Sequence, residues 1–283
     1  MQPVLDSTIL HSGIPTECVS ANTIAAGSQF EYPGIAGTGF FARRERQIFY
    51  FTAMHCVRAG PASPRPALAT LMIPYRHTGR TASSDDFVQF ESAYTLEQFL
   101  DGEWQDTVDL ITCPVKEPSR SRDLRHLLGR SAKLPPSADW MDTYLASPAG
   151  SEALARNSLA AVLIGFPRGS PNTFIAYADT PAESLLRAEA LVVPVTVGRS
   201  SLTDCFAIEP AGCPYPYSGF SGSPVFARVA PPHGPQYTLI GMVVCGSTSV
   251  LHVLRVGRLL EAAIGDDQPL DRALPAATGR LQR

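Results

Sequence analysis

The sequence predicts an all-β protein, and three observations lead to this class. Apolar runs of strand length recur roughly every ten to fifteen residues along the chain. Most of these runs end at glycine, proline, aspartate or serine, the residues that favour turns. Few segments carry apolar residues at helical spacing, so a parallel sheet covered by helices is disfavoured. The pattern is typical of β-sandwiches and β-barrels.

The expected elements follow one another along the chain. The first clear pair of strands, residues 40–42 and 48–52, forms a hairpin with a charged tip. A helix is expected at residues 121–130, which start with Ser and Asp and place leucines on one face, and a second at 255–265, which end at a glycine. Further strands are expected at residues 66–75, 106–115, 159–167, 173–179, 188–197, 204–210, 223–229 and 237–246.

The composition excludes several functional classes. The chain has 283 residues, of which 45% are hydrophobic and 17% charged, so it is long enough for a sizeable core. Its net charge of −3 gives no electrostatic reason to bind nucleic acid or an acidic membrane. No apolar stretch approaches the ~18 residues of a membrane span. The N-terminus lacks a basic segment followed by an apolar run, so we expect no signal peptide and a cytoplasmic location.

Six cysteines are present, but their spacing is long and irregular. Without a CxxC motif a structural zinc site is not expected, and we expect no metal or cofactor. Free, buried thiols fit a cytoplasmic chain best. Cys205 and Cys213 are close in sequence, and a bridge between them is left open.

Three segments contain residues suited to nucleophilic catalysis. His55 ends the apolar run "FYFTAMHCV", Asp109 lies in "DTVDLI", and Ser221 lies in the glycine-rich "SGFSGSPVF". A serine, a histidine that accepts its proton and a carboxylate that orients the histidine form a catalytic triad. Each residue alone has a structural explanation, as a core histidine, an edge charge or a turn serine. Asp106 is a rival to Asp109, but residues three apart in a strand lie on opposite faces.

In this order the motifs resemble the trypsin/chymotrypsin-like serine protease superfamily. "TAMHC" matches the family's Thr-Ala-x-His-Cys, and "DLI" matches its Asp-aliphatic strand. "GFSGSP" matches Gly-x-Ser-Gly-(Gly/Ser)-Pro, in the style of the bacterial glutamyl endopeptidase and HtrA branches. "LIGFPRG", "TLIGMVVCGST" and "VLRVGRLLEAAIG" resemble other parts of the family, so the resemblance spans residues 37–265.

The resemblance implies two perpendicular six-stranded antiparallel β-barrels with a C-terminal helix. Residues 1–265 would form a single protease domain. The first barrel is expected at about 16–116, an insertion at 117–157, and the second barrel with the helix at 158–265. Residues 266–283 are expected to form a flexible tail.

The resemblance also implies the roles of the site residues. Ser221 is the nucleophile, His55 its base, and Asp109 the acceptor that orients His55. The backbone N–H groups of Gly219 and Ser221 form the oxyanion hole. The substrate-binding residues are expected to be Tyr215, Val244, Cys245, Gly246 and Leu251.

Three positions depart from the family pattern. Phe220 replaces the aspartate that pairs with a newly cut N-terminus in digestive members, so no such activation is expected. Cys56 matches a half-cystine whose partner near Phe40 is missing, so it is expected to be a free thiol beneath His55. Val244 replaces a serine that supports the catalytic aspartate in many members, and that support is absent.

The function predicted on this basis is a serine endopeptidase that acts on a protein or peptide. Val243 replaces the histidine of the glutamyl-specific branch, and no acidic residue is placed to bind Arg or Lys, so small or apolar side chains are the expected preference. An activating or regulatory protein partner is a further hypothesis. The first alternative is a catalytically weak or partner-gated trypsin-fold scaffold or binding module. The second is an α/β-hydrolase esterase, whose Gly-x-Ser-x-Gly motif would need glycine where Ser223 lies.

Overall fold

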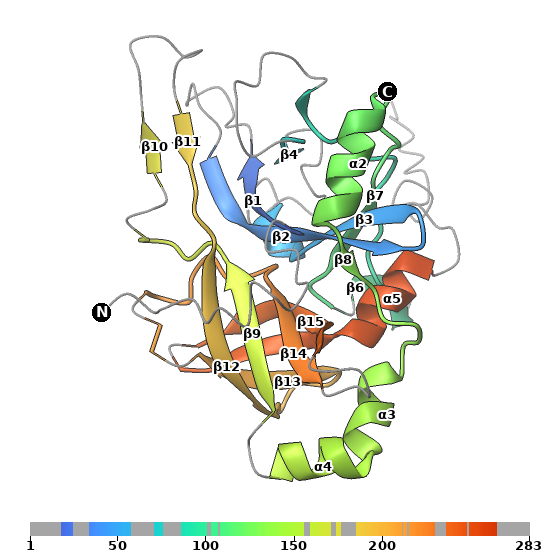
Figure 1. The fold of residues 1–283 in the computed structure, drawn as a ribbon, viewed down its shortest axis with the longest axis vertical. Helices are drawn as coiled ribbons and strands as arrows, with labels where there is room; N and C mark the ends of the chain where they lie inside the picture. Colours follow the sequence, from blue (N-terminus) through green and yellow to red (C-terminus); the bar gives the residue numbers. More distant parts are fainter. Residues whose placement is uncertain are drawn as a thin grey trace, which may run out of the picture.

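The computed structural model is a mostly β protein built from two main sheets and a C-terminal helix, which confirms the predicted fold class. In Figure 1 the first sheet, in blue to teal, lies above the second, in yellow to orange. The structure describes residues 18–24, 34–57, 71–75, 86–100, 103–106, 108–155, 159–170, 174–176, 185–210, 212–213, 215–229, 236–247 and 249–264.

The first sheet curls into a half-barrel. Its strands pair in the order β4-β1-β2-β3-β7, and the short β8 adds to β2 in parallel. Between β4 and β7, residues 87–94 contribute only isolated bridges, such as Pro74 with Phe87 and Phe90 with Val115. The regular sixth strand implied by the resemblance is therefore missing from the described part of this sheet. The strands are β1 (Val19–Ile24), β2 (Gly34–Arg44), β3 (Gln47–Thr52), β4 (Leu71–Met72), β7 (Ile111–Pro114) and β8 (Ala132–Lys133).

The second sheet closes into an antiparallel barrel in the order β12-β13-β16-β15-β14-β9. Its interior follows the two-residue alternation of a strand: Val193, Val195 and Val197 of β12 are buried, and the residues between them are more exposed. The strands are β9 (Ala160–Gly165), β12 (Leu191–Arg199), β13 (Cys205–Pro210), β14 (Pro224–Val229), β15 (Gln236–Gly246) and β16 (Leu251–Arg255).

Apolar packing joins the two sheets. One cluster of buried side chains takes Phe40 and Phe51 from the first sheet, Ile164 from the barrel and Leu259 from the C-terminal helix. That helix, α5 (Val256–Ile264), packs against β7 of the first sheet and against β15 and β16 of the barrel. Burying side chains of this size stabilises the fold by about 1.5–3 kcal/mol each, so the relative position of the sheets is fixed by their shared core.

Four helices are described, and the sequence predicted two of them. α2 (Ser121–Arg130) and α5 lie where helices were expected. α3 (Trp140–Ala146) and α4 (Pro148–Ala155) lie inside the expected insertion and were missed. Both are short, and α4 hardly separates polar from apolar residues, so its sequence lacks the periodicity that identifies a helix.

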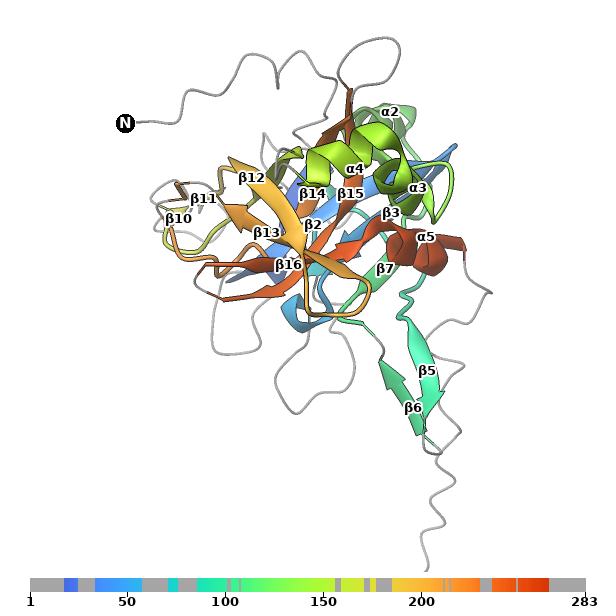
Figure 2. The ribbon, with the colours of Figure 1, turned by 90° about the horizontal axis from the view of Figure 1, so that it is seen from below.

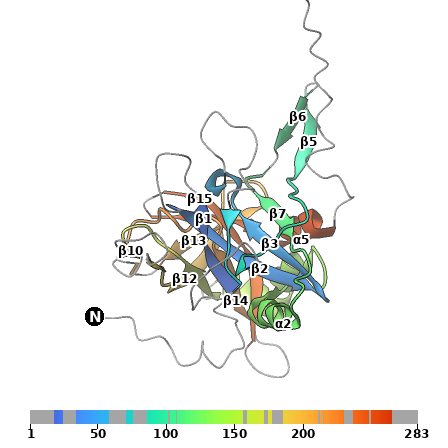
Figure 3. The same cartoon turned by 90° about the horizontal axis from the view of Figure 1, so that it is seen from above.

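Two small ribbons complete the description. β5 (Glu97–Leu100) and β6 (Glu103–Asp106) form a hairpin that extends away from the two sheets in Figures 2 and 3. β10 (Phe174–Ala176) pairs with β11 (Leu185–Arg187). No helix in the described part of the chain is long and apolar enough to cross a membrane. The predicted tail, residues 266–283, lies outside the described residues, and the proposed domain boundaries stay a prediction.

Candidate active site

His55 lies on a single 3-10 turn, Met54–Cys56, that follows β3. The turn buries Met54 and Cys56 and leaves His55 exposed. Thr52, the last residue of β3, pairs with Ile111, the first residue of β7. Because an antiparallel pair brings the end of one strand to the start of the other, the connection that carries Asp109 meets the turn that carries His55.

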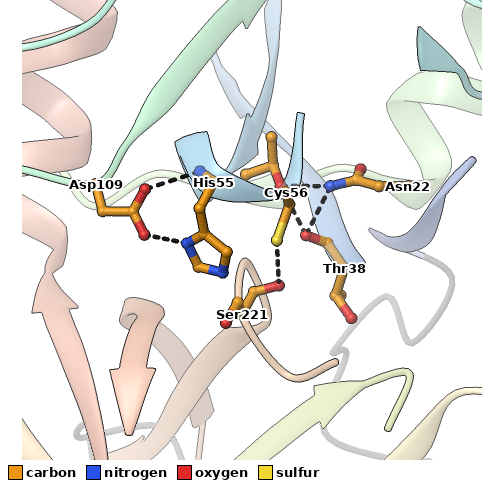
Figure 4. Close-up of polar contacts among 7 residues, drawn as sticks. Asn22, Thr38, His55, Cys56, Asp109 and Ser221 are labelled. Atoms are coloured by element: carbon orange, nitrogen blue, oxygen red, sulfur yellow. Dashed lines mark hydrogen bonds and ion pairs between the residues drawn. The ribbon is translucent and has the colours of Figure 1, made fainter. Parts of the chain in front are cut away.

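The Asp109 carboxylate holds His55 through two hydrogen bonds. Its Oδ1 accepts the backbone N–H of His55 at 3.0 Å, and its Oδ2 bonds the ring Nδ1 (Figure 4). A carboxylate only accepts, so Nδ1 carries the proton and Nε2 is the nitrogen available to a substrate or a nucleophile. The hydrogen bond to Asp109 raises the pKa of His55 from 6.5 to about 10, because it stabilises the imidazolium.

Ser221 lies on a tight loop that two glycines shape. Gly219 has a φ of 96° and Gly222 a φ of 86°, values that side chains with a Cβ rarely adopt. A Cβ on Gly219 would lie 2.5 Å from the carbonyl oxygen of Phe166, and one on Gly222 would lie 1.8 Å from that of Thr38. The loop is therefore pressed against its neighbours on both sides of Ser221.

Phe220 anchors the same loop from within the barrel. Its side chain is fully buried and belongs to the same apolar cluster of the barrel as Val225 and Val243. Phe220, which the sequence analysis noted because it replaces an aspartate, thus has a packing role.

The backbone around Ser221 forms a pair of free donors. The carbonyl of Ser218 accepts the N–H of Arg168 at 2.7 Å. Across a trans peptide the N–H of Gly219 points the opposite way, away from Arg168. Among the described residues, neither the N–H of Gly219 nor that of Ser221 donates a hydrogen bond to the protein. Two unpaired N–H groups on the same short loop suit a developing oxyanion.

The three candidate catalytic side chains lie in one place. Figure 4 shows Ser221 beneath the imidazole of His55, with Asp109 on the other side of the ring. No hydrogen bond joins Ser221 Oγ to His55 Nε2 in this part of the structure. A nucleophile and its base are often further apart without substrate than in the reacting complex, so this geometry is compatible with catalysis.

A cavity of about 530 Å³ opens beside Ser221. Four of the expected substrate-binding residues line it, namely Tyr215, Cys245, Gly246 and Leu251. The sequence interpretation missed several others, although the alternating tyrosines of "PYPYSG" could have indicated Tyr217. The additional lining residues are Cys213, Pro216, Tyr217, Ser218, Val243 and Ser247.

Val244 lies away from the cavity. Its side chain packs in the cluster between the two sheets, while Val243 and Cys245 on either side line the cavity. Successive side chains of β15 point to opposite faces, so Val244 cannot share a wall with its two neighbours. The role of Val244 in substrate binding stays a prediction, and the side chain that lines the cavity at this point is that of Val243.

The six cysteines are free in the structure, including Cys205 and Cys213. Cys56 is buried, and its thiol lies 3.7 Å from the carbonyl oxygen of Ser221. Gly37 faces it, and a Cβ on Gly37 would lie 2.4 Å from Cys56 Sγ. The position opposite Cys56 thus holds a glycine, and the thiol packs directly against the nucleophile loop.

The segment that carries the two rival aspartates differs from its prediction. We expected one strand over residues 106–115, but β6 ends at Asp106 and β7 begins at Ile111. Asp109 lies in the connection between them, where a bend aims it at His55. The side chain of Asp106 lies outside the described residues.

No group of three or more His, Cys, Asp or Glu side chains in the described part of the chain is arranged to hold a metal ion.

The sequence matches no protein-family model and no curated protein. Solved structures match at low identity. Human heparin binding protein is 11% identical over 90% of this chain and 94% of its own, with a TM-score of 0.47. The NS6 protease from murine norovirus 1 is 13% identical over 83% and 89%, with a TM-score of 0.37. A structure from work on the Sesbania mosaic virus VPg protein is 15% identical over 88% and 89%, with a TM-score of 0.38. At these identities and TM-scores the matches carry no argument about activity.

Proposed function

We propose that the protein is a serine endopeptidase of the trypsin-like type. One observation carries the proposal: the unpaired N–H groups of Gly219 and Ser221 lie on the loop beneath the His55–Asp109 pair, at the edge of a cavity. A structural turn needs neither two free donors nor an oriented imidazole at the same place. Together these groups supply a nucleophile, a base and a site for negative charge.

The reaction would proceed through an acyl-enzyme. Ser221 Oγ attacks the peptide carbonyl carbon while His55 Nε2 takes the hydroxyl proton, and the two N–H groups bind the resulting oxyanion. His55 then delivers that proton to the departing amine nitrogen, and the C–N bond breaks. Water, activated by His55 Nε2, then attacks the acyl-enzyme ester and releases the carboxylic acid product and free Ser221. Asp109 keeps Nδ1 protonated throughout.

The base must be neutral to act, and this sets the pH range. The hydrogen bond to Asp109 holds the pKa of His55 near 10, so its imidazole is mostly charged at neutral pH. Hydrolysis should therefore increase as the pH rises above neutrality.

The cavity supports substrates with a neutral side chain before the cleaved bond. None of its described lining residues carries a carboxylate, an ammonium or a guanidinium, and its walls include Val243 and Leu251. A charged side chain would enter without a partner, which is costly. Cleavage of a peptide library is expected mainly after small or apolar residues, and dominant cleavage after Arg, Lys or Glu would contradict this preference.

The second candidate is a binding module with the same fold. The missing hydrogen bond between Ser221 and His55 and the apolar Val244 favour it. An α/β-hydrolase esterase no longer competes, because the closed antiparallel barrel differs from the parallel sheet that such an enzyme needs. A protein or peptide substrate, a regulatory partner and a cytoplasmic location stay parts of the proposal.

A fluorophosphonate probe separates the two candidates. We expect the purified protein to form a covalent adduct that maps to Ser221, and Ser221→Ala to form none. His55→Ala should label far more slowly, which distinguishes activated chemistry from slow modification of any exposed serine. If the wild-type protein stays unlabelled between pH 7 and 10, the binding module is the better reading.

A further inference from the structure

Thr38 of β2 grips the nucleophile loop at two points. Its backbone N–H donates to the carbonyl of Ser221 at 3.1 Å, and its side-chain Oγ1 donates to the carbonyl of Gly219 at 2.8 Å. The same Oγ1 accepts the N–H of Phe166 at 3.1 Å. A single hydroxyl therefore links the loop to the segment whose Arg168 N–H holds Ser218.

A buried chain of hydrogen bonds lies behind Thr38. Thr52 Oγ1 donates to the Thr38 carbonyl at 2.8 Å. Asn22 Nδ2 donates to that carbonyl at 3.2 Å and to Thr52 Oγ1 at 2.5 Å, as Figure 4 shows in part. Tyr50 OH donates in turn to Asn22 Oδ1. All four side chains are fully buried, and every step runs from donor to acceptor toward the loop.

The backbone makes room for this chain. Gly39 faces Tyr50, and a Cβ there would lie 2.1 Å from the tyrosine hydroxyl. The pairing of β1 with β2 shifts register between Asn22 and Thr23, and such bulges re-aim side chains. Gly222 approaches the Thr38 carbonyl so closely that no side chain fits between them.

These contacts fix the two peptide planes on either side of the Gly219 Cα. The plane before it is held through the Ser218 carbonyl, and the plane after it through the Gly219 carbonyl. Glycine has no Cβ to restrict its backbone, so its N–H direction depends on such external anchors. Without the Thr38 hydroxyl, the Gly219 carbonyl in the second plane loses its partner, and that plane is then held by the bond of 3.2 Å from the Phe220 N–H to the Tyr217 carbonyl.

We propose that Thr38 is a positioning residue, which holds the Gly219 and Ser221 N–H groups toward the substrate carbonyl and is itself oriented by the Tyr50–Asn22–Thr52 chain. The role rests on the proposed peptidase function. A buried polar network is costly unless it is fully satisfied, and apolar side chains would fill the same space. This network ends at the loop that carries Ser221, where the orientation of the backbone N–H groups matters most.

The test compares Thr38→Val, which keeps the shape but removes the hydroxyl, with Thr38→Ser, which keeps the hydroxyl. Losing one well-aimed oxyanion donor costs roughly 10²–10³-fold in kcat, and a misdirected donor should cost about 10–100-fold. Thr38→Val should lower kcat and the fluorophosphonate labelling rate by that amount, with KM changed less than about threefold, because the loss concerns the transition state. Thr38→Ser should restore both. Equal kcat and labelling rate for wild type and Thr38→Val would overturn the proposal.

Hydrogen exchange provides a readout that does not depend on activity. In Thr38→Val, the hydrogen-bonded loop amides of Phe220, Gly222 and Ser223 should exchange at least about tenfold faster than in wild type, while amides of β12 and β13 should not change. Tyr50→Phe, which removes only the far end of the chain, should show the same local pattern more weakly. If the wild-type protein neither labels nor hydrolyses peptides, the peptidase proposal fails while exchange still decides whether Thr38 holds the loop. Unchanged exchange in both variants would refute the positioning role.

Discussion

The barrel closes through regular strand pairs, whereas the first sheet is completed between β4 and β7 by isolated bridges. Their interiors differ in the same direction. Among the described residues, the buried polar side chains that lie on strands all belong to the first sheet. They are Ser20, Asn22, Thr23, Thr38, Thr52 and Thr112.

The difference corresponds to a division of labour. The barrel offers an apolar frame that anchors Phe220, and its strands β15 and β16 form the cavity wall together with the loop that precedes β14. The first sheet places His55 and Asp109 on the connections after β3 and before β7. Its Thr38 also forms a hydrogen bond to the loop that precedes β14 of the barrel. Irregular connections on a rigid scaffold are where catalytic groups usually lie.

Among the substitutions that distinguish the first sheet from the barrel, Asp109→Asn should have the largest effect on kcat. An amide can donate to Nδ1, which places the imidazole in the wrong tautomer and leaves Nε2 without a free lone pair, and such a change costs about 10⁴-fold in kcat. Initial rates on a peptide substrate measure the loss. Asp109→Ala is the control, because it removes the carboxylate charge without introducing an amide donor. The barrel should be unaffected, so a large fall in stability would indicate that Asp109 has a structural rather than catalytic role.

The pH dependence should come from the first sheet alone. Because the pKa of His55 is raised, kcat/KM should increase about tenfold for each pH unit below that pKa, with a midpoint above 6.5. The sign for stability is opposite: the charged pair contributes fully below pH 6.5, and the contribution is lost as the pH rises through about 10. Rate profiles and urea unfolding at each pH measure the two effects. An activity maximum below pH 6.5 would contradict this assignment.

The local motifs of the site could be predicted from the sequence because each one combines an unusual residue with the turn that it needs. Ser221 between glycines and His55 at the end of an apolar run are of this kind. The role of Thr38 could not be predicted, since its partners Asn22, Gly219 and Phe166 lie far from it in the chain. A threonine in a strand has no local feature that indicates such contacts.

The face of the sheet to which a side chain points is equally hard to predict where a strand is buried on both sides. Val243 and Val244 are chemically the same, but Val243 lines the cavity while Val244, which was expected to bind substrate, packs in the core cluster. The alternation of β15 decides between them, but an unbroken apolar run hides that alternation. The helix α4 was missed because its polar and apolar residues show no clear period, and α3 was missed because its seven residues are too few to establish one.

Leucine truncation should show that the barrel contributes more stability than the edge of the first sheet. Leu163 is fully buried in the closed barrel, and its change to Ala should lower the free energy of unfolding by about 2–5 kcal/mol. Leu71 lies on the two-residue β4, where the neighbours can collapse more easily, so Leu71→Ala should cost less. Denaturant unfolding of the two variants measures both values. Equal losses would mean that the half-barrel is as rigid as the closed barrel.

The smallest effect is expected from a comparison of two buried hydroxyl groups of the first sheet, one connected by hydrogen bonds to Thr38 and one not. Thr112 Oγ1 is buried and has no hydrogen-bond partner among the described residues, whereas Thr52 Oγ1 bonds both Asn22 and Thr38. Thr112→Val removes an unsatisfied group and should raise the free energy of unfolding by about 1 kcal/mol, with unchanged kcat. Thr52→Val removes one bond from Asn22 and one from the Thr38 carbonyl and leaves the 3.2 Å bond between those two groups, so it should lower both stability and kcat. Equal effects of the two changes would show that hydroxyl burial, rather than the connection to Thr38, decides the outcome.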